Sequence, residues 1–425
     1  MNAHELKAKI DSGAFDADFK MLYGECENAA KRYKKAIDGF VSVFGDGNGL
    51  RLFSAPGRTE VGGNHTDHQH GCVLAGAVNL DVIAVVNQTG GKRIRIKSEG
   101  FEMDTVDAAV LEPQQKENNR SAALIRGVAA GFGKMGYDIG GFDAYTTSNV
   151  LKGSGLSSSA AFEVLVSNIV NTLFCNSAAD AVQIAKISQS AERDYFGKPC
   201  GLLDQMASSV GGFTYADFND PSNPEVRKTS VDLTKSGCTL CVVDTGGNHS
   251  NLTGDYADIT IECKKISNAL GVEFLRDADE EKFYKDMASL RISCGDRAVL
   301  RAFHFFNENR RVGLQKAALE KGDFAEFFRL VNESGDSSYK YLQNVYSNHA
   351  ANEQGISLAL AVTSRFLGNS GACRVHGGGF AGTIQCYVPD SRLSEYVKTI
   401  EWVFGKGSCH PLHIRPIGGY ELTEK

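Results

Sequence analysis

Two glycines precede a run of three consecutive serines in residues 152–159, which read KGSGLSSS. Glycines at this spacing let backbone N–H groups approach an anion, and serine hydroxyls add donors and can ligate Mg²⁺. A strand pattern ends directly before this segment, and the apolar, helix-periodic run SSSAAFEVLVSNIVNTLF begins within it. The first turn of that helix would add unpaired N–H groups and the positive end of the helix dipole. The segment therefore predicts a loop that binds polyphosphate.

A serine cap on a tight turn is the simpler interpretation of the same residues, because serine is preferred at helix N-termini with or without a ligand. Three serines after two glycines, between a strand and an apolar helix, favour phosphate binding over that alternative. The segment is not a Walker A loop, because no Gly-Lys-Ser/Thr follows the glycines. It is not a Rossmann fingerprint either, because the third glycine is missing. Another template must therefore apply.

A second polar cluster lies in residues 55–71, which read APGRTEVGGNHTDHQHG. A neutral polyol is recognised by carboxylate acceptors and mixed donor/acceptor side chains, and His65 with Asp67 fits that chemistry. Metal chelation is a competing interpretation, since His65, His68 and His70 lie with Asp67 within six residues, but their spacing matches no common zinc signature. A polar turn without function is the remaining alternative. We expect a loop that binds a polar organic ligand.

Strand and helix patterns surround both loops. The first fifty residues are predicted to be helical, and a short strand broken by Pro56-Gly57 follows them. Further strands are expected at 71–88, 93–98, 142–150, 213–218, 238–244, before 376 and at 383–389. Further helices are expected at 120–135, 157–174, 178–196, 254–270, 279–286, 295–321, 323–334 and 350–366. No fixed-period repeat and no low-complexity linker is present, so we expect the two halves to pack tightly.

The chain has 425 residues, more than one hydrophobic core usually organises, which predicts two domains or one large two-lobed unit. Its net charge of −6 provides no extended positive field for a nucleic-acid backbone. No uncharged apolar run approaches the roughly 20 residues that cross a bilayer, and no signal-peptide pattern opens the chain. We therefore expect a cytoplasmic protein that binds neither nucleic acid nor membrane.

Two cysteines, Cys238 and Cys241, are separated by two residues. They lie in an alternating strand pattern, whereas the remaining cysteines are scattered along the chain. We predict that both are buried reduced thiols and not metal ligands.

Three segments resemble the motifs of one kinase family. Residues 153–161, GSGLSSSAA, resemble the phosphate-loop motif of the GHMP kinases, which include galactokinases and homoserine, mevalonate and phosphomevalonate kinases. Residues 55–71 are similar to the galactokinase signature APGRVNLIGEHTDYNxG, and residues 374–382, RVHGGGFAG, resemble the third motif, usually GGGFGG. The motifs occur in order, and the resemblance covers nearly the whole chain. It implies an ATP-dependent sugar 1-kinase of the galactokinase type that uses Mg²⁺.

The same resemblance implies an α+β GHMP kinase fold with the active site between two domains. The N-terminal domain would resemble ribosomal protein S5 domain 2, and the C-terminal domain would be ferredoxin-like. We expect these domains at 1–212 and 213–425, with the terminal strand returning to the first. The expected partners are a galactose-like sugar and ATP, with adenine near residues 79–86, and the protein is expected to be a monomer.

Single residues receive roles from the resemblance. Arg58 matches the family arginine beside the transferred phosphoryl group, and Asp204 in PCGLLDQ matches the carboxylate that orients or deprotonates the anomeric hydroxyl. The predicted sugar-binding residues are Asn64, His65, Asp67, Gly201 and Tyr256. The predicted phosphate-binding residues are Gly153, Ser154, Gly155, Leu156, Ser157, Ser158, Ser159, Gly378 and Gly379. The predicted Mg²⁺ ligands are Ser159 and Glu192. Without the resemblance, Asp204 would be interpreted as a helix cap and Glu192 as a surface glutamate.

Three positions depart from the galactokinase signature. Asn64 replaces a glutamate, Glu60 replaces an asparagine and His68 replaces a tyrosine. Asn64 removes a negative charge from the part of the site expected to contact O6 of the sugar, which keeps a hexuronic acid or a pentose lacking C6 open as a substrate. The alternative acceptors are galacturonate, N-acetylgalactosamine and arabinose. Galacturonate gains most, because its carboxylate would no longer be repelled. A catalytically silent sugar sensor is the alternative from another class, although the presence of both Arg58 and Asp204 argues against it.

Overall fold

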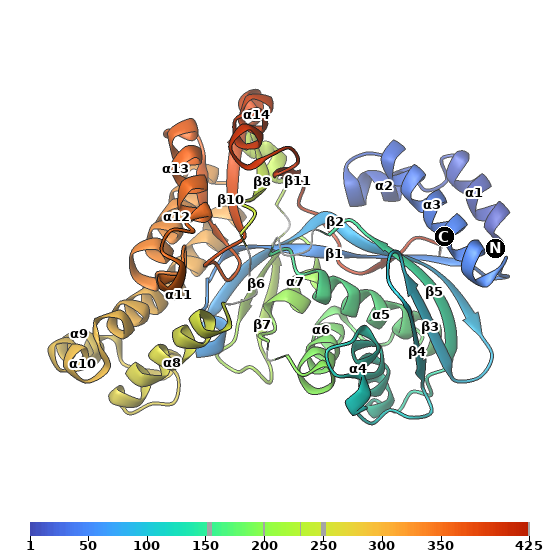
Figure 1. Cartoon of the computed structure of the whole chain (residues 1–425), viewed down its shortest axis with the longest axis horizontal. Coiled ribbons are helices and arrows are strands. Elements are labelled where there is room, and N and C mark those ends of the chain that lie inside the picture. Colours follow the sequence, from blue (N-terminus) through green and yellow to red (C-terminus); the bar gives the residue numbers. More distant parts are fainter. Residues whose placement is uncertain (151–154, 199, 230, 248–251, 424–425) are drawn as a thin grey trace.

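The computed structural model describes residues 1–150, 155–198, 200–229, 231–247 and 252–423. Its larger sheet has eight strands in the order β12-β1-β2-β5-β3-β4, with β6 paired to β2 and β7 to β6. The strands are β1 (Arg51–Gly62), β2 (Cys72–Thr89), β3 (Arg93–Ser98), β4 (Met103–Asp107), β5 (Gly141–Ser148), β6 (Phe213–Asp217), β7 (Glu225–Thr229) and β12 (Tyr420–Glu421). The long strands β1 and β2 run across the middle of the molecule and join its two lobes (Figure 1).

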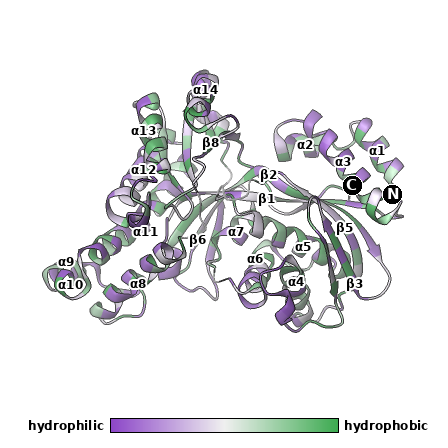
Figure 2. Ribbon diagram, in the orientation of Figure 1, coloured by the Kyte–Doolittle hydropathy of each residue, from purple (hydrophilic) through white to green (hydrophobic). Residues whose placement is uncertain are grey.

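Helices cover both faces of this sheet (Figure 1). One face carries α4 (Ser121–Lys134), α5 (Ser158–Phe174), α6 (Ala181–Ser190), the π-helical turn η3 (Ala191–Phe196) and α7 (Leu203–Val210). The other face carries α1 (Ala3–Asp11), α2 (Asp16–Tyr23) and α3 (Glu27–Phe44). Residues of α5 are mostly hydrophobic, whereas α1–α3 mix hydrophobic and hydrophilic residues (Figure 2). This pattern is expected for a central helix that is packed on several sides.

The smaller sheet belongs to the second lobe and has four antiparallel strands in the order β11-β8-β10-β9. They are β8 (Cys238–Asp244), β9 (Ala372–His376), β10 (Thr383–Pro389) and β11 (Cys409–Leu412). The helices of this lobe are α8 (Thr253–Leu270), α9 (Glu280–Lys285), α10 (Met287–Cys294), α11 (Asp296–Lys321), α12 (Phe324–Ser337), α13 (Gly355–Leu367) and α14 (Leu393–Phe404). Cys238 and Cys241 are buried free thiols on β8, as predicted.

The remaining elements are short helical turns between these helices and strands. They are η1 (Asp67–Gln69), η2 (Gln115–Glu117), η4 (Leu233–Ser236), η5 (Leu275–Asp277), η6 (Ser338–Leu342), η7 (Asn348–Ala350) and η8 (Asp390–Arg392). Among the described residues, no helix is both long and apolar enough to cross a membrane.

One local prediction was wrong, and one predicted helix differs in its geometry. The predicted strand break at Pro56 is an irregularity within the continuous strand β1, where the register with β2 shifts between Pro56 and Arg58. A bulge tolerates proline because the residue at that position does not need to donate a backbone hydrogen bond to the neighbouring strand. The predicted helix 178–196 changes from α- to π-helical geometry at Ala191, which places Glu192 within the π-helical turn.

The predicted boundary between residues 212 and 213 falls between α7 and β6. Because β6 and β7 pair within the larger sheet, whereas β8 opens the smaller one, we propose that the change of domain lies between β7 and β8. The terminal strand β12 pairs antiparallel with β1, and it thus returns to the N-terminal sheet.

A buried charge cluster ties the N-terminal helices to the sheet and to the end of the chain. The carboxylate of Asp81 on β2 is fully buried and accepts hydrogen bonds from Tyr23 (2.7 Å) and from Arg415 (3.2 Å). It also pairs with Arg32 of α3. Burial disfavours the ionised carboxylate, but the two arginines, with hydrogen bonds from Ser54 and Tyr23, lower the pKa of Asp81. The cluster thereby joins segments that are far apart in the sequence.

Candidate active site

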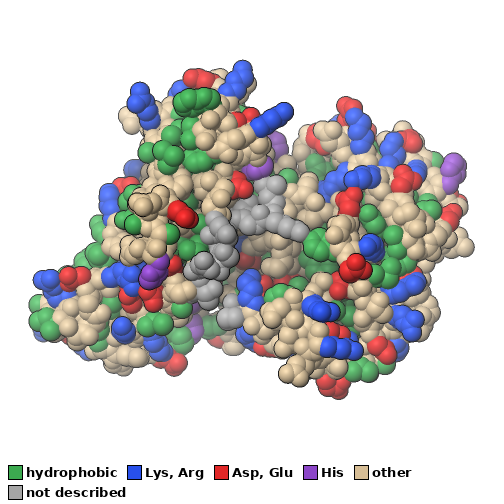
Figure 3. Space-filling view, viewed as in Figure 1, with side chains coloured by type: hydrophobic (Ala, Val, Ile, Leu, Met, Phe, Trp, Pro, Cys, Tyr) green, Lys and Arg blue, Asp and Glu red, His purple; other side chains and the backbone are tan. Residues whose placement is uncertain are grey.

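The predicted site residues lie where the two lobes meet. On the face shown in Figure 3, the molecular surface is hollowed between the lobe that carries α12–α14 and the part that carries α1–α3. Residues 55–71 contact the start of α5, the first turn of α7 and the glycine-rich turn after β9. The start of α5 also contacts the first turn of α7. Segments separated by hundreds of residues therefore form one site.

Arg58 and Asp204 form an ion pair at its centre. Arg58 follows the bulge in β1, and its Nε and Nη2 atoms lie 2.8 Å and 2.6 Å from Asp204 Oδ1. The guanidinium also donates to the carbonyl of Gly155, and the backbone N–H of Arg58 donates to the carbonyl of Leu156 (3.0 Å). Arg58 therefore holds the catalytic carboxylate candidate against the phosphate-loop candidate.

Asp204 lies in the first turn of α7, and about a third of its side chain (34%) is exposed. Its second oxygen accepts a hydrogen bond from the hydroxyl of Ser157. Burial opposes ionisation, but Arg58 and Ser157 together hold the pKa of Asp204 below its ordinary value. Asp204 is therefore an ionised acceptor at neutral pH that a ligand can reach.

The start of α5 has an unusual backbone. Gly155 and Ser157 both have positive φ angles, 70° and 55°, and Ser157 makes no side-chain capping bond to the helix. Its hydroxyl binds Asp204, which argues against the simple N-cap interpretation. Leu156 is fully buried, so only its backbone faces this region, and Ser158 and Ser159 form the first turn of α5. The predicted residues Gly153 and Ser154 lie outside the described part of the chain.

Asp67 and Gly201 pack directly against each other. A Cβ atom on Gly201 would lie 1.8 Å from Asp67 Oδ2, so a larger residue would force that carboxylate to move. Burial is the main cause that raises the pKa of Asp67, and the nearby charge of Asp204 raises it further. The site thus contains two neighbouring carboxylates, of which Asp204 has the arginine partner.

His65 and Tyr256 lie against the glycine-rich turn. His65 Nε2 donates to the carbonyl of Gly378 (2.9 Å), and the Tyr256 hydroxyl donates to the carbonyl of Gly379 (3.0 Å). Their rings are stacked with centroids 6.2 Å apart, and a Cβ on Gly378 would lie 2.5 Å from the Tyr256 ring. Burial lowers the pKa of His65 to about 4, so the imidazole is neutral. Both predicted sugar-binding residues therefore share one wall of the site.

The glycine-rich turn also approaches the start of α5. A Cβ on Gly155 would lie 3.1 Å from His376 Nδ1, and one on Gly377 would lie 3.7 Å from Gly155 Cα. This contact agrees with the prediction that the third motif closes against the phosphate loop.

Glu192 is almost fully buried, in contrast to the surface glutamate that its helix alone would predict. Its carboxylate accepts hydrogen bonds from Lys198 and Gln205, both at 2.8 Å. The amide of Gln205 also donates to Glu163 (3.0 Å), whose Oε1 atom is buried without a partner. Burial and the neighbouring charge of Glu192 raise the pKa of Glu163 well above its ordinary value.

Glu163 was missed by the sequence predictions. The available signal was a single carboxylate within the apolar run of α5, four residues after Ser159 and thus on the same helix face. Carboxylate and hydroxyl oxygens suit Mg²⁺, which usually binds one or two carboxylates together with substrate phosphates. No three His, Cys, Asp or Glu side chains in the described ranges form a metal cluster by themselves. The donor set therefore fits a magnesium ion that arrives with a nucleotide.

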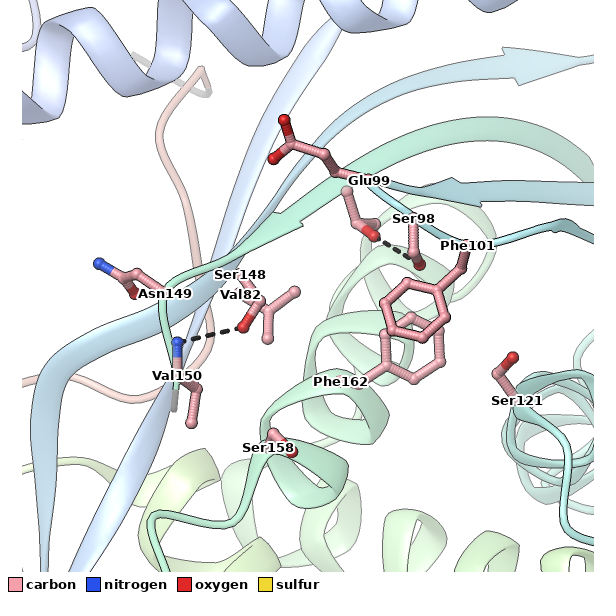
Figure 4. A pocket seen from close by; sticks show the side chains of 11 residues that line it. Val82, Ser98, Glu99, Phe101, Ser121, Ser148, Asn149, Val150, Ser158 and Phe162 are labelled. Atoms are coloured by element: carbon pink, nitrogen blue, oxygen red, sulfur yellow. Dashed lines mark hydrogen bonds between the residues drawn. The ribbon is translucent and has the colours of Figure 1, made fainter. Parts of the chain in front are cut away.

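A cavity of about 520 Å³ begins beside Ser158. Phe101 and Phe162 line one side of it, and Val82 and Val150 line another (Figure 4). The predicted adenine region, residues 79–86, contributes only Val82 to this lining. The remaining lining residues come from segments near residues 98–101, 121, 146–150 and 158–162, which sequence patterns could not bring together.

Comparison with known proteins places these features in one family. Residues 123–212 match the GHMP kinases N-terminal domain, and residues 38–88 match the galactokinase galactose-binding signature. The chain is 30% identical over 355 residues to the galactokinase of Streptomyces coelicolor, covering 83% of this chain and 88% of that protein. It is 28% identical over 374 residues to the galactokinase of Clostridium tetani, covering 86% and 91%.

Solved structures show the same fold. Lactococcus lactis galactokinase complexed with galactose superposes with a TM-score of 0.75 at 22% identity, covering 90% of this chain and 98% of that one. Methanococcus jannaschii mevalonate kinase superposes with a TM-score of 0.59 at 14% identity, covering 85% and 98%. The predicted α+β GHMP kinase fold is confirmed.

Proposed function

Because this chain belongs to the galactokinase family of the GHMP kinases and is therefore a sugar kinase, we propose that it transfers the γ-phosphoryl group of ATP to the anomeric hydroxyl of galactose. The observation that carries the proposal is the ion pair between Arg58 and Asp204 beside the start of α5. It unites an ionised acceptor, a cation and a phosphate-loop candidate. These are the parts that phosphoryl transfer to an alcohol requires.

Asp204 has the central role in the proposed mechanism. Its carboxylate accepts the hydrogen bond of the anomeric hydroxyl and aligns that oxygen for in-line attack on the γ-phosphorus. Arg58 keeps Asp204 ionised and balances charge on the transferred phosphoryl group. Most of the acceleration then comes from positioning and charge stabilisation, without a covalent intermediate.

The sugar is proposed to lie between Asp67 and the wall formed by His65 and Tyr256. Asp67 offers carboxylate oxygens to sugar hydroxyls, and Gly201 provides the space that this carboxylate needs. The Tyr256 hydroxyl donates to the carbonyl of Gly379 on the same wall, and a hydroxyl can take part in hydrogen bonds both as donor and as acceptor. This arrangement suits a neutral polyol.

The phosphates are proposed to bind the N–H groups at the start of α5 and of the glycine-rich turn, at residues 153–159, 378 and 379. Glu192 and a hydroxyl of Ser158 or Ser159 would hold Mg²⁺, with Glu163 as a further carboxylate. The ion supplies charge neutralisation for the phosphates. Hydrogen bonds from Lys198 and Gln205 hold the Glu192 carboxylate in place.

We also propose a reducing, cytoplasmic location, because all eleven cysteines are free thiols. The monomeric state remains a prediction.

The cavity of Figure 4 is the proposed adenine site, and replacing Phe101 tests it. Phe101 is 52% exposed, so Phe101→Ala should change stability little. Because stacking of a base on an aromatic ring contributes about 1–3 kcal/mol, we expect the KM for ATP to rise roughly tenfold. The KM for the sugar should stay constant. Met103→Ala, an exposed residue on neighbouring β4 that does not line the cavity, is the matched control. An unchanged KM for ATP would show that this cavity is not the adenine site.

The function itself is tested by ADP release with galactose, N-acetylgalactosamine, galacturonate, glucose, arabinose, homoserine and mevalonate, with and without Mg²⁺. We expect turnover of galactose and its loss when EDTA removes the metal. Turnover of another sugar in place of galactose would show that this other sugar is the substrate. A thermal shift with galactose but no ADP release would contradict the proposal and support a silent sensor.

A further inference from the structure

Asn64 is fully buried and uses all of its hydrogen-bonding capacity within the protein. Its Nδ2 donates to Glu60 Oε1 and to the carbonyl of Gly377, both at 2.8 Å. Its Oδ1 accepts from Asn344 Nδ2 (2.7 Å) and from the Ser338 hydroxyl (3.2 Å). An amide has two donor hydrogens and two acceptor lone pairs, so none remains for a sugar hydroxyl.

Asn344, which binds Asn64, also binds the glycine-rich turn. The side-chain Nδ2 of Asn344 also donates to the carbonyl of Gly378 (3.0 Å). The backbone carbonyl of Asn344 accepts a hydrogen bond from the Phe380 N–H (2.5 Å). A Cβ on Gly379 would lie 2.0 Å from that carbonyl oxygen. The two asparagine amides thus orient the carbonyl groups of Gly377 and Gly378.

These carbonyls determine where the sugar wall lies. The carbonyl of Gly378 also accepts from His65, and the next carbonyl, that of Gly379, accepts from Tyr256. A shift of the turn would therefore move both rings that are proposed to contact the sugar. Asn64 affects the sugar site through the turn and not by direct contact.

Glu60 explains why an amide stands at position 64. The family signature has asparagine at position 60 and glutamate at position 64, whereas this chain has the reverse, and the two side chains are in contact. Glu60 is buried and is paired with Arg374 of β9 at 3.1 Å. One carboxylate and one amide are thus retained with exchanged positions, and the net charge of the pair is unchanged.

We propose that Asn64 and Asn344 are positioning residues that fix the 377–379 turn, and that Glu60 and Asn64 form a compensated exchange of one carboxylate and one amide. The inference rests on the proposed sugar-kinase function. It replaces the prediction that Asn64 binds the sugar, and it removes the reason to favour galacturonate.

A double-mutant cycle tests the exchange. Asn64→Glu would bury a second carboxylate against Glu60, and we expect kcat to fall about 30-fold or more, with KM for the sugar changed much less. Glu60→Asn should also reduce kcat, because Arg374 loses its partner. The combined Glu60→Asn/Asn64→Glu variant should recover at least about tenfold over Asn64→Glu alone. Recovery smaller than twofold would overturn the compensated exchange.

Substrate discrimination separates positioning from direct contact. Each variant is assayed with galactose and with 6-deoxygalactose, which differ only in O6. If Asn64 acts through the turn, kcat/KM falls by the same factor for both sugars and their ratio stays within about twofold of wild type. A ratio that shifts about tenfold would show that position 64 contacts O6 and would overturn the proposal.

Asn344→Ala provides the same test should Asn64→Glu fail to fold, as judged by urea unfolding. It removes the second amide of the turn without adding a charge, and we expect a loss of roughly tenfold in kcat with an unchanged sugar ratio. Wild-type kcat for Asn344→Ala would contradict the positioning role. Failure of the proposed function is recognised separately, because the wild-type protein would then turn over neither sugar.

Discussion

Asp204→Asn is expected to lower kcat for galactose by about a thousandfold, the middle to upper part of the range for general acid–base groups. An amide can keep contacts with Ser157 and Arg58, but it carries no charge and cannot accept the proton of the anomeric hydroxyl. The measurement is steady-state ADP release, combined with calorimetric binding of galactose and of ATP. Both affinities should change less than about fivefold, because catalysis and not binding is removed.

Asp143→Asn is the matched control for this prediction. Asp143 also forms a two-point ion pair with an arginine, Arg95, but it lies on β5, outside the site. Its replacement should leave kcat close to that of the wild type. A kcat for Asp204→Asn within tenfold of wild type would show that another group accepts the proton.

Arg58→Met is expected to lower kcat by about a thousandfold as well, which is the lower end of the effect of arginines that stabilise phosphoryl transfer. Methionine has a similar length but cannot hold Asp204 or bind the carbonyl of Gly155. Because Arg58 lowers the pKa of Asp204 against the opposing effect of burial, its loss should raise that pKa. Since the ionised carboxylate is the active form, the acid limb of kcat/KM should move to higher pH.

The measurement is a pH profile of kcat/KM for wild type and Arg58→Met, with Arg95→Met as the control. The control removes a comparable guanidinium from an ion pair outside the site, so its profile should match that of the wild type. An Arg58→Met profile with reduced height but an unmoved acid limb would mean that Arg58 acts on the phosphoryl group alone.

The sequence motifs predicted the pairing of Arg58 with Asp204, which the structure shows. Arg58, Asp204, His65 and Tyr256 could be named because each stands in a short segment with a distinctive pattern of glycines and polar residues. The structure brings these segments together, and the contact between Gly155 and the glycine-rich turn was also expected. Such motifs are local, and their mutual arrangement follows from the family fold.

Residues outside the motifs could not be assigned in this way. Glu163 appears in the sequence as one polar residue in a buried helix, and only the approach of Gln205 and Glu192 shows its environment. The cavity that Phe101 and Phe162 line combines segments with no shared pattern. Asn64 was predicted to bind the sugar because it occupies the position of the family's glutamate, yet its amide oxygen accepts hydrogen bonds from Asn344 and Ser338 of the other lobe. Each of these features depends on long-range packing.

The cluster around Asp81 has a consequence for how the protein is made. The partner Arg415 lies 334 residues further along the chain, and β12 follows it to complete the edge of the sheet beside β1. During synthesis at roughly 5–20 residues per second, β1 and β2 leave the ribosome well before these partners exist. Until then Asp81 has at most one of its two arginines, and the edge of β1 is open. Folding of the first lobe is therefore completed only after the second lobe has been translated, which makes chaperone protection of the nascent chain advantageous.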